Sequence, residues 1–171
     1  DTRIGYNRPA NATEKIVVQG VAMGLNYMIK NGYSVGGNFS WNKLGSFTKT
    51  AELPYAGFNT PERTFKANIS KRITAKDSWG INVAYRYQSE FTWESGFVVP
   101  TTVGTPLFQN TQVPAINNFD AQFSKKINSL KTVVKIGGTN ILGDGFIQAY
   151  GSSNIGSVYY ISLSFDQFMN K

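Results

Sequence analysis

The residues of this chain that could do chemistry are charged and polar side chains without histidine or cysteine. The sequence contains no His and no Cys, so the commonest general base, the commonest metal ligand and the thiolate nucleophile are all missing. Asp and Glu together number 10, and no two of them form a convincing catalytic pair. We therefore expect no enzymatic activity, no cofactor and no metal site in this chain.

Five charged residues nevertheless recur at regular positions. Arg86, Glu90 and Glu94 follow one another at intervals of four residues, and Asp120 and Lys135 have the same alternating phase in later segments. Side chains of a β-strand point alternately to opposite faces, so strands would bring these five groups to one polar face. Strands are therefore the elements that must position them.

The segment 79–94 shows the strand pattern most clearly. Apolar residues such as Ile81 and Val83 alternate with polar residues such as Asn82 and Arg86. This period of two predicts a strand with one apolar and one polar face. A strand with lipid on one side and water on the other has this pattern in outer-membrane barrels.

Similar alternation predicts seven strands in all. In chain order they span residues 16–30, 34–44, 64–73, 79–94, 118–127, 131–139 and 157–165. No apolar run approaches the roughly 18 residues of a membrane helix. Tyr, Phe and Gly are abundant at 9, 12 and 17 residues, which also favours β structure. We predict an all-β, antiparallel fold.

The predicted connections alternate in length. Short turns follow the first, third and fifth strands, and long loops span residues 45–63, 95–117 and 140–156. This is the arrangement of bacterial outer-membrane barrels.

The charged residues are also sorted between the two ends of the predicted strands. The net charge is +7, and basic residues gather at or near the short turns, at Lys30, Lys71, Arg72, Lys76, Lys125, Lys126 and Lys131. Acidic residues fall toward the long loops, at Glu52, Glu62, Glu90, Glu94 and Asp144. The basic residues form a rim, which argues against nucleic acid as a partner.

Two local motifs allow more than one interpretation. Asn31-Gly32 suggests a two-residue hairpin turn, but burial favours a three-residue loop that pairs Leu25 with Phe39, because it keeps apolar residues opposite one another. The segment 137–143, GGTNILG, lacks the lysine and the helix of a phosphate loop. Its glycines favour a curved or tightly packed strand.

The number of strands predicts that this chain does not close a barrel alone. Seven is odd, whereas bacterial single-chain barrels have even strand numbers, and open sheet edges are not tolerated in lipid. We expect residues 1–171 to be a segment of a larger transmembrane β-barrel. The chain starts at Asp1 without a signal-like segment, which fits a processed form or part of a longer polypeptide.

Interfacial girdle residues are expected at Tyr27, Trp41, Trp79, Trp93 and Tyr159. In such a barrel Arg86, Glu90, Glu94, Asp120 and Lys135 would line the lumen or meet a plug.

Several stretches resemble the C-terminal barrel region of Bacteroidetes-type TonB-dependent receptors. They are residues 58–63 (FNTPER), 83–94 (VAYRYQSEFTWE), 118–122 (NFDAQ), 130–142 (LKTVVKIGGTNIL), 149–151 (AYG) and 155–166 (IGSVYYISLSFD). Their order and spacing together carry the resemblance, which covers about two thirds of the chain. The tail 167–171 departs from it, since barrel assembly signals usually finish on an aromatic residue.

The resemblance implies the last seven strands of a 22-stranded barrel without its plug domain. Such outer-membrane receptors import large, scarce nutrients, such as a siderophore, cofactor, glycan or peptide, with energy that TonB delivers to the plug. The implied partners are the rest of the barrel and plug, TonB, outer-membrane lipid, and a surface lipoprotein or larger envelope complex. The implied location is the outer membrane of a Gram-negative bacterium.

Two other functions stay open at this point. A receptor-like barrel could serve as a structural or assembly subunit of a multi-protein outer-membrane complex. A soluble β-sandwich that binds carbohydrate would also alternate apolar and polar residues, with the charges on its surface and the aromatic residues in its core. Extraction without detergent would favour the sandwich.

Overall fold

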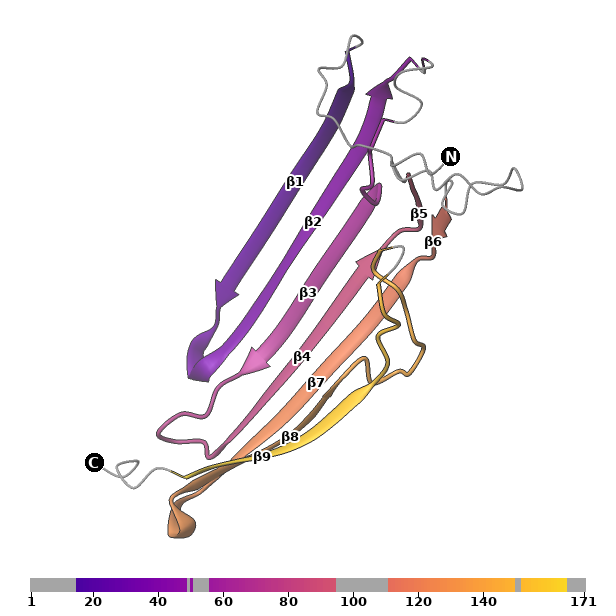
Figure 1. Cartoon of the computed structure of the whole chain (residues 1–171). Coiled ribbons are helices and arrows are strands. Elements are labelled where there is room, and N and C mark those ends of the chain that lie inside the picture. The colour runs from indigo at the N-terminus through magenta and orange to yellow at the C-terminus, as the bar shows by residue number, and fades with distance from the viewer. Residues whose placement is uncertain (1–14, 49, 51–55, 95–110, 150–151, 166–171) are drawn as a thin grey trace.

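The computed structural model describes residues 15–48, 50, 56–94, 111–149 and 152–165. These residues form a seven-stranded antiparallel sheet and a separate two-stranded sheet (Figure 1). The large sheet has the order β1-β2-β3-β4-β7-β8-β9. Its strands are β1 (Val17–Met28), β2 (Tyr33–Ser46), β3 (Arg63–Lys71), β4 (Trp79–Gln88), β7 (Ile116–Ile127), β8 (Thr132–Thr139) and β9 (Val158–Phe165). The small sheet pairs β5 (Phe91–Trp93) with β6 (Thr111–Val113).

The predicted all-β class and the seven antiparallel strands are confirmed. Every strand of the large sheet pairs with the strand that precedes or follows it among these seven. Within the described residues the sheet is open, with β1 and β9 at its two edges (Figure 1). No helix in the described part of the chain is long and apolar enough to cross a membrane.

One face of the large sheet is apolar from edge to edge. A row of register partners crosses all seven strands in the order Tyr27, Val35, Ile69, Val83, Ala121, Gly138 and Tyr159. Large side chains on this face stay open to solvent, with exposed fractions of 61% for Ile69 and 72% for Ile161. The alternation in the sequence therefore produces an apolar face that no described segment covers.

The opposite face carries polar rows. One row reads Gly24, Asn38, Lys66, Arg86 and Asn118, and the next reads Asn26, Gly36, Asn68, Ala84 and Asp120. Hydroxyl pairs join adjacent strands of this face, with Ser34 Oγ 2.7 Å from Ser70 Oγ and Ser40 Oγ 2.6 Å from Thr64 Oγ1. The sheet is thus two-sided in the way the sequence predicts.

Two adjacent glycines of β8 lie under tyrosines of β9. A Cβ atom at Gly137 would stand 2.7 Å from the Tyr160 hydroxyl and 2.8 Å from the Ala121 carbonyl oxygen. At Gly138, on the other face, it would stand 2.8 Å from Cδ1 of Tyr159. The prediction of a tightly packed glycine strand is confirmed.

The predicted register of the first hairpin is wrong by two residues. Leu25 pairs with Gly37 and Met23 with Phe39, because the three-residue loop is the 3-10 turn η1 (Lys30–Gly32) and not residues 31–33. Asn31 and Gly32 adopt positive φ angles of 62° and 82° there. A shift of two residues leaves each side chain on its face, so alternation alone could not distinguish the two registers.

The predicted strand 79–94 is also wrong at its end. The main sheet keeps only β4, which stops at Gln88, and Phe91 begins the separate strand β5. Phe91 is buried, and Val113 and Ile116 are fully buried at this end of the molecule. Burial of these apolar side chains in a local core accounts for the departure of the chain from the main sheet.

Candidate functional site

A hollow lies on the polar face of the large sheet. Its volume is about 560 Å³, and its lining includes Asn38, Lys66, Arg86, Asn118, Asp120 and Phe146. Strands β2, β3, β4 and β7 supply the first five of these residues, and the connection between β8 and β9 supplies Phe146. Two of the five predicted lumen residues, Arg86 and Asp120, therefore meet in one site.

Asp120 fixes the connection that closes the hollow on one side. Its Oδ1 accepts hydrogen bonds from the backbone N–H of Asn140 at 2.9 Å and from Nδ2 of Asn118 at 3.0 Å. Asn140 is 2% exposed and has a left-handed φ of 52°. Its own Nδ2 donates to the carbonyl of Asp144 at 2.8 Å. The carboxylate of Asp120 thus links β7 to the start of the connection between β8 and β9.

Arg86 is held from the same connection. The guanidinium carbon lies 5.3 Å from the centre of the Phe146 ring, a distance typical of a cation–π contact. With its amide oxygen turned toward Arg86, Gln148 accepts hydrogen bonds from both terminal nitrogens, at 3.0 and 3.2 Å. Phe146 is in turn paired with Ile155 by two backbone hydrogen bonds of 3.1 and 2.8 Å.

Two buried side-chain atoms of the hollow have no hydrogen-bond partner among the described residues. They are Nε of Arg86 and Oδ1 of Asn118, and Asn118 is 8% exposed. No carboxylate of the described residues pairs with Arg86. Buried polar groups are normally hydrogen-bonded, so this arrangement suits binding of a polar group. No group of three His, Cys, Asp or Glu residues in the described part of the chain could hold a metal ion.

The other three predicted lumen residues lie elsewhere. Lys135 is on the polar face but lines a different hollow, together with Ser124. Glu90 follows β4 and is exposed. Glu94 follows β5, where its Oε2 accepts from the backbone N–H of Gly57 at 2.9 Å. Glu52 lies outside the described residues. The regular spacing of the charges in the sequence therefore does not translate into one cluster.

The five predicted girdle residues are distributed over the molecule. Trp79 lies at the end of the sheet that carries the short turns, and Trp41 lies toward the long loops. Tyr27 and Tyr159 belong to the apolar row that crosses the sheet. Trp93 lies in β5, outside the large sheet, with its ring 6.4 Å from that of Phe91.

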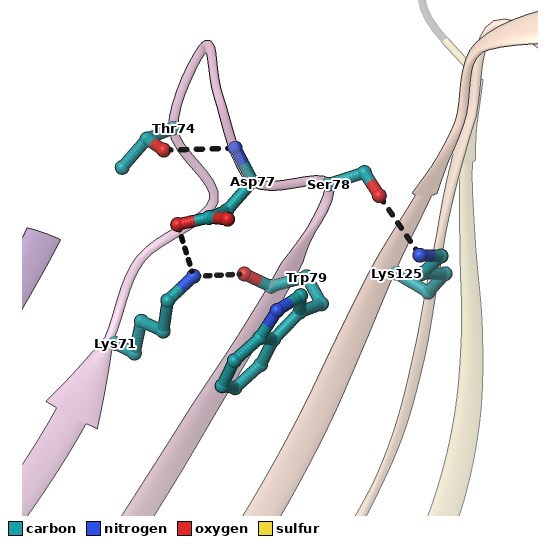
Figure 2. A network of polar contacts seen from close by, with 6 residues as sticks. All are labelled: Lys71, Thr74, Asp77, Ser78, Trp79 and Lys125. Atoms are coloured by element: carbon teal, nitrogen blue, oxygen red, sulfur yellow. Dashed lines mark hydrogen bonds and ion pairs between the residues drawn. The ribbon is translucent and has the colours of Figure 1, made fainter. Parts of the chain in front are cut away.

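Two lysines flank Trp79 at the short-turn end (Figure 2). Lys71 Nζ lies 4.0 Å from the centre of the Trp79 ring and 3.1 Å from a carboxylate oxygen of Asp77. On the other side of the tryptophan, Lys125 Nζ donates to Ser78 Oγ at 2.8 Å. Both lysines have apolar-face positions, and their amines lie beside groups of the turn, as expected for side chains that snorkel.

Four residues of the hollow were missed by the sequence analysis: Asn118, Asn140, Phe146 and Gln148. A signal for Asn118 exists, because asparagine recurs at polar-face positions of successive strands, as in Asn26, Asn38 and Asn68. The other three lie in the β8–β9 connection, where no periodicity indicates which side chains face the sheet.

Comparison with protein-family models, with curated proteins and with solved structures finds no match for this chain.

Proposed function

We propose that this chain is a wall segment of a transmembrane β-barrel in the outer membrane, namely the C-terminal region of a TonB-dependent transporter. The observation that carries the proposal is the apolar face that crosses all seven strands opposite a continuous polar face. A membrane barrel needs this two-sidedness in every strand, because one side contacts lipid and the other contacts water.

Strand length supports the same proposal. The seven strands contain between 8 and 14 residues, which brackets the roughly 9–11 residues that a tilted strand needs to cross a bilayer. A soluble sandwich of this size would bury the apolar face under a second sheet. Within the described ranges the large apolar side chains of this face, such as Ile69 and Ile161, stay exposed.

The open edges indicate that further strands belong to the structure. In an antiparallel meander of seven strands, β1 and β9 run in the same direction. Direct pairing of these two edges would be parallel, so an antiparallel barrel requires an odd number of additional strands. The rest of the receptor would supply these strands, together with the plug and the segment that contacts TonB.

A tilted barrel also accounts for the scatter of the girdle residues. Crossing six gaps of about 4.8 Å between strands tilted by about 40° changes the depth in the bilayer by about 19 Å. Tyr27 and Tyr159 lie at the two ends of one such row. They would therefore approach opposite surfaces of an apolar band that is about 25 Å tall.

Cysteine labelling tests the wall assignment. This chain has no native cysteine, so Asn82→Cys and Val83→Cys would report on adjacent residues of opposite faces. In the full polypeptide in outer membranes, we expect a membrane-impermeant, water-soluble maleimide to react with the first variant and a lipid-soluble maleimide to react with the second. Equal labelling of both by the water-soluble reagent would contradict the proposal, because Val83 would then face water. Labelling of the second variant by neither reagent would favour the buried core of a soluble sandwich.

The transport function requires a separate test on the whole polypeptide. Its intact mass in detergent-solubilised outer membranes, with peptide mapping upstream of Asp1, should be several times the 18.9 kDa of this chain. Purified C-terminal domain of TonB should then bind it through the upstream region. A mass near 18.9 kDa would contradict the transporter and point to a barrel built from several chains.

A further inference from the structure

Two lysines with apolar-face positions flank Trp79 at the short-turn end of the sheet. Figure 2 shows Lys71 on one side of the indole and Lys125 on the other. Lys125 is the register partner of Trp79. A charged amine on a face that is otherwise apolar requires a partner, and the two lysines differ in the partners they have.

The charge of Lys71 is satisfied within the chain. Its side chain is 2% exposed, and Nζ forms an ion pair with Asp77 at 3.1 Å. The same amine donates to the backbone carbonyl of Trp79 at 3.2 Å and lies 5.7 Å from the centre of the Tyr33 ring. Lys71 and Asp77 therefore leave little charge for an external ligand.

Lys125 is exposed, and its amine contacts a neutral group. Nζ donates to Oγ of Ser78 at 2.8 Å, and no carboxylate of the described residues forms an ion pair with it. Because the serine oxygen accepts this bond, its own proton is left to donate elsewhere. The pair thus offers an ammonium group and a hydroxyl donor beside the tryptophan ring.

Hydrogen bonds join neighbouring turns into one continuous basic edge. The backbone N–H of Arg72 donates to the carbonyl of Gly32 at 3.0 Å, and that of Lys126 donates to the carbonyl of Ser78 at 2.7 Å. This edge carries the exposed side chains of Lys30, Arg72 and Lys76. Lys126 and Lys131, which have contacts of their own, lie on the same edge.

The opposite end of the apolar face lacks this charge pattern. Trp41 is the tryptophan there, and its Nε1 donates to a carboxylate oxygen of Glu62 at 3.0 Å. Lys43, the register partner of Gln19 in β1, is a lysine with an apolar-face position near that end. Among the described residues, the net positive charge lies at the short-turn end of the sheet.

We propose that Lys125, Ser78 and Trp79 form a binding site for the phosphate of an anionic phospholipid headgroup. The inference rests on the proposed membrane barrel, in which tryptophan marks the headgroup level and the apolar face receives the acyl chains. Lysine and serine donors suit phosphate oxygens. The adjacent basic edge favours a lipid with net negative charge over a zwitterionic one.

Lipid competition on the full polypeptide tests this site. The protein in neutral detergent would be titrated with phosphatidylglycerol and phosphatidylcholine of identical chains, and bound lipids would be counted by native mass spectrometry. We expect wild type to retain phosphatidylglycerol preferentially, and Lys125→Gln to reduce that preference about fivefold. The matched control Lys43→Gln, at the other end of the same face, should leave it within a factor of about two, because Lys43 lies away from the basic edge.

The possible results separate this site from the barrel itself. A wild-type protein that needs detergent but binds both lipids equally would overturn the site and leave the proposed function intact. An equal loss in both lysine variants would overturn it as well, since charge alone would explain the preference. Extraction without detergent would overturn the proposed function. The Ser78→Ala variant, which keeps all charges, should lower the preference less than Lys125→Gln does.

Discussion

In the middle of the apolar face, aromatic and aliphatic side chains meet through contacts that need no directional bond, whereas the carboxylate of Asp120 on the polar face depends on particular partners. The rings of Tyr85 and Phe119 lie 4.6 Å apart, and those of Trp79 and Phe123 lie 6.5 Å apart. Asp120 instead requires two donors in fixed places. The stability of the apolar face should therefore depend on whether each residue is apolar. The stability of the polar face should depend on which residue occupies each position.

The largest effect is expected from a charge on the apolar face. Val83→Arg should lower the free energy of unfolding by about 2–4 kcal/mol, the cost of an arginine facing lipid near the bilayer midplane. The matched change Asn82→Arg, one residue away on the polar face, should cost less than about 1 kcal/mol. Urea unfolding of the full polypeptide in lipid vesicles would measure both. Equal costs would mean that the two faces have similar surroundings.

The next effect tests the partner dependence of the polar face. Asp120→Ala removes the acceptor for the N–H of Asn140 and for Nδ2 of Asn118, which should cost about 1–3 kcal/mol. Hydrogen exchange of residues 140–149 should accelerate.

Asp144→Ala in the same connection is the control for this change. The described contact of Asp144 with Asn140 uses the backbone carbonyl, so its side chain can be removed without losing that bond. Unchanged hydrogen exchange of residues 140–149 in the Asp120→Ala variant would show that the carboxylate does not hold the loop.

A smaller effect is expected from crowding on the polar face. Gly137→Ala would bring a methyl group to 2.7 Å from the Tyr160 hydroxyl and 2.8 Å from the Ala121 carbonyl oxygen. We expect a loss of about 1–2 kcal/mol and a broken hydrogen bond between Tyr160 and Gln122, which is 2.9 Å long. Gly156→Ala, where no atom lies within 4 Å of the added carbon, should be neutral. Thermal unfolding would compare the two variants.

The smallest effect should come from an exchange of one apolar residue for another on the open face. Ile161 is 72% exposed in β9, and Ile161→Leu conserves its volume and its hydrophobic character. The free energy of unfolding should change by less than about 0.5 kcal/mol. A large loss would indicate a specific neighbour at this edge, such as a closely packed adjacent strand.

The sequence alone predicts the features that depend on the alternation of side chains between the two faces of a strand. Period-two alternation predicts the seven strands and the face on which Val83 or Arg86 lies, because burial of one face fixes side-chain direction. It could not separate two hairpin registers that differ by two residues, since Leu25 faces the same side in both. The turn chemistry of Asn31 and Gly32, each with positive φ, decided between them.

The candidate site could be predicted only in part. The alternation correctly places Arg86 and Asp120 on the polar face of the sheet. Their partners Gln148 and Asn140 lie in a loop, where the sequence has no periodicity. The alternation also continues past Gln88 into Glu90 and Glu94, although the backbone leaves the sheet there. Burial of Phe91, Val113 and Ile116 is a long-range effect that a local pattern does not contain.

The order of the strands allows such a sheet to gain or lose strands in pairs. Because each strand of the large sheet pairs with its neighbour in the order of the chain, a hairpin can be added or removed without rerouting any other connection. Pairing follows the order of these strands along the chain, so hairpins can be added to the sheet one after another. The sheet can therefore lengthen by repetition, with the small β5–β6 sheet as an elaboration of one loop that leaves the order of the wall unchanged.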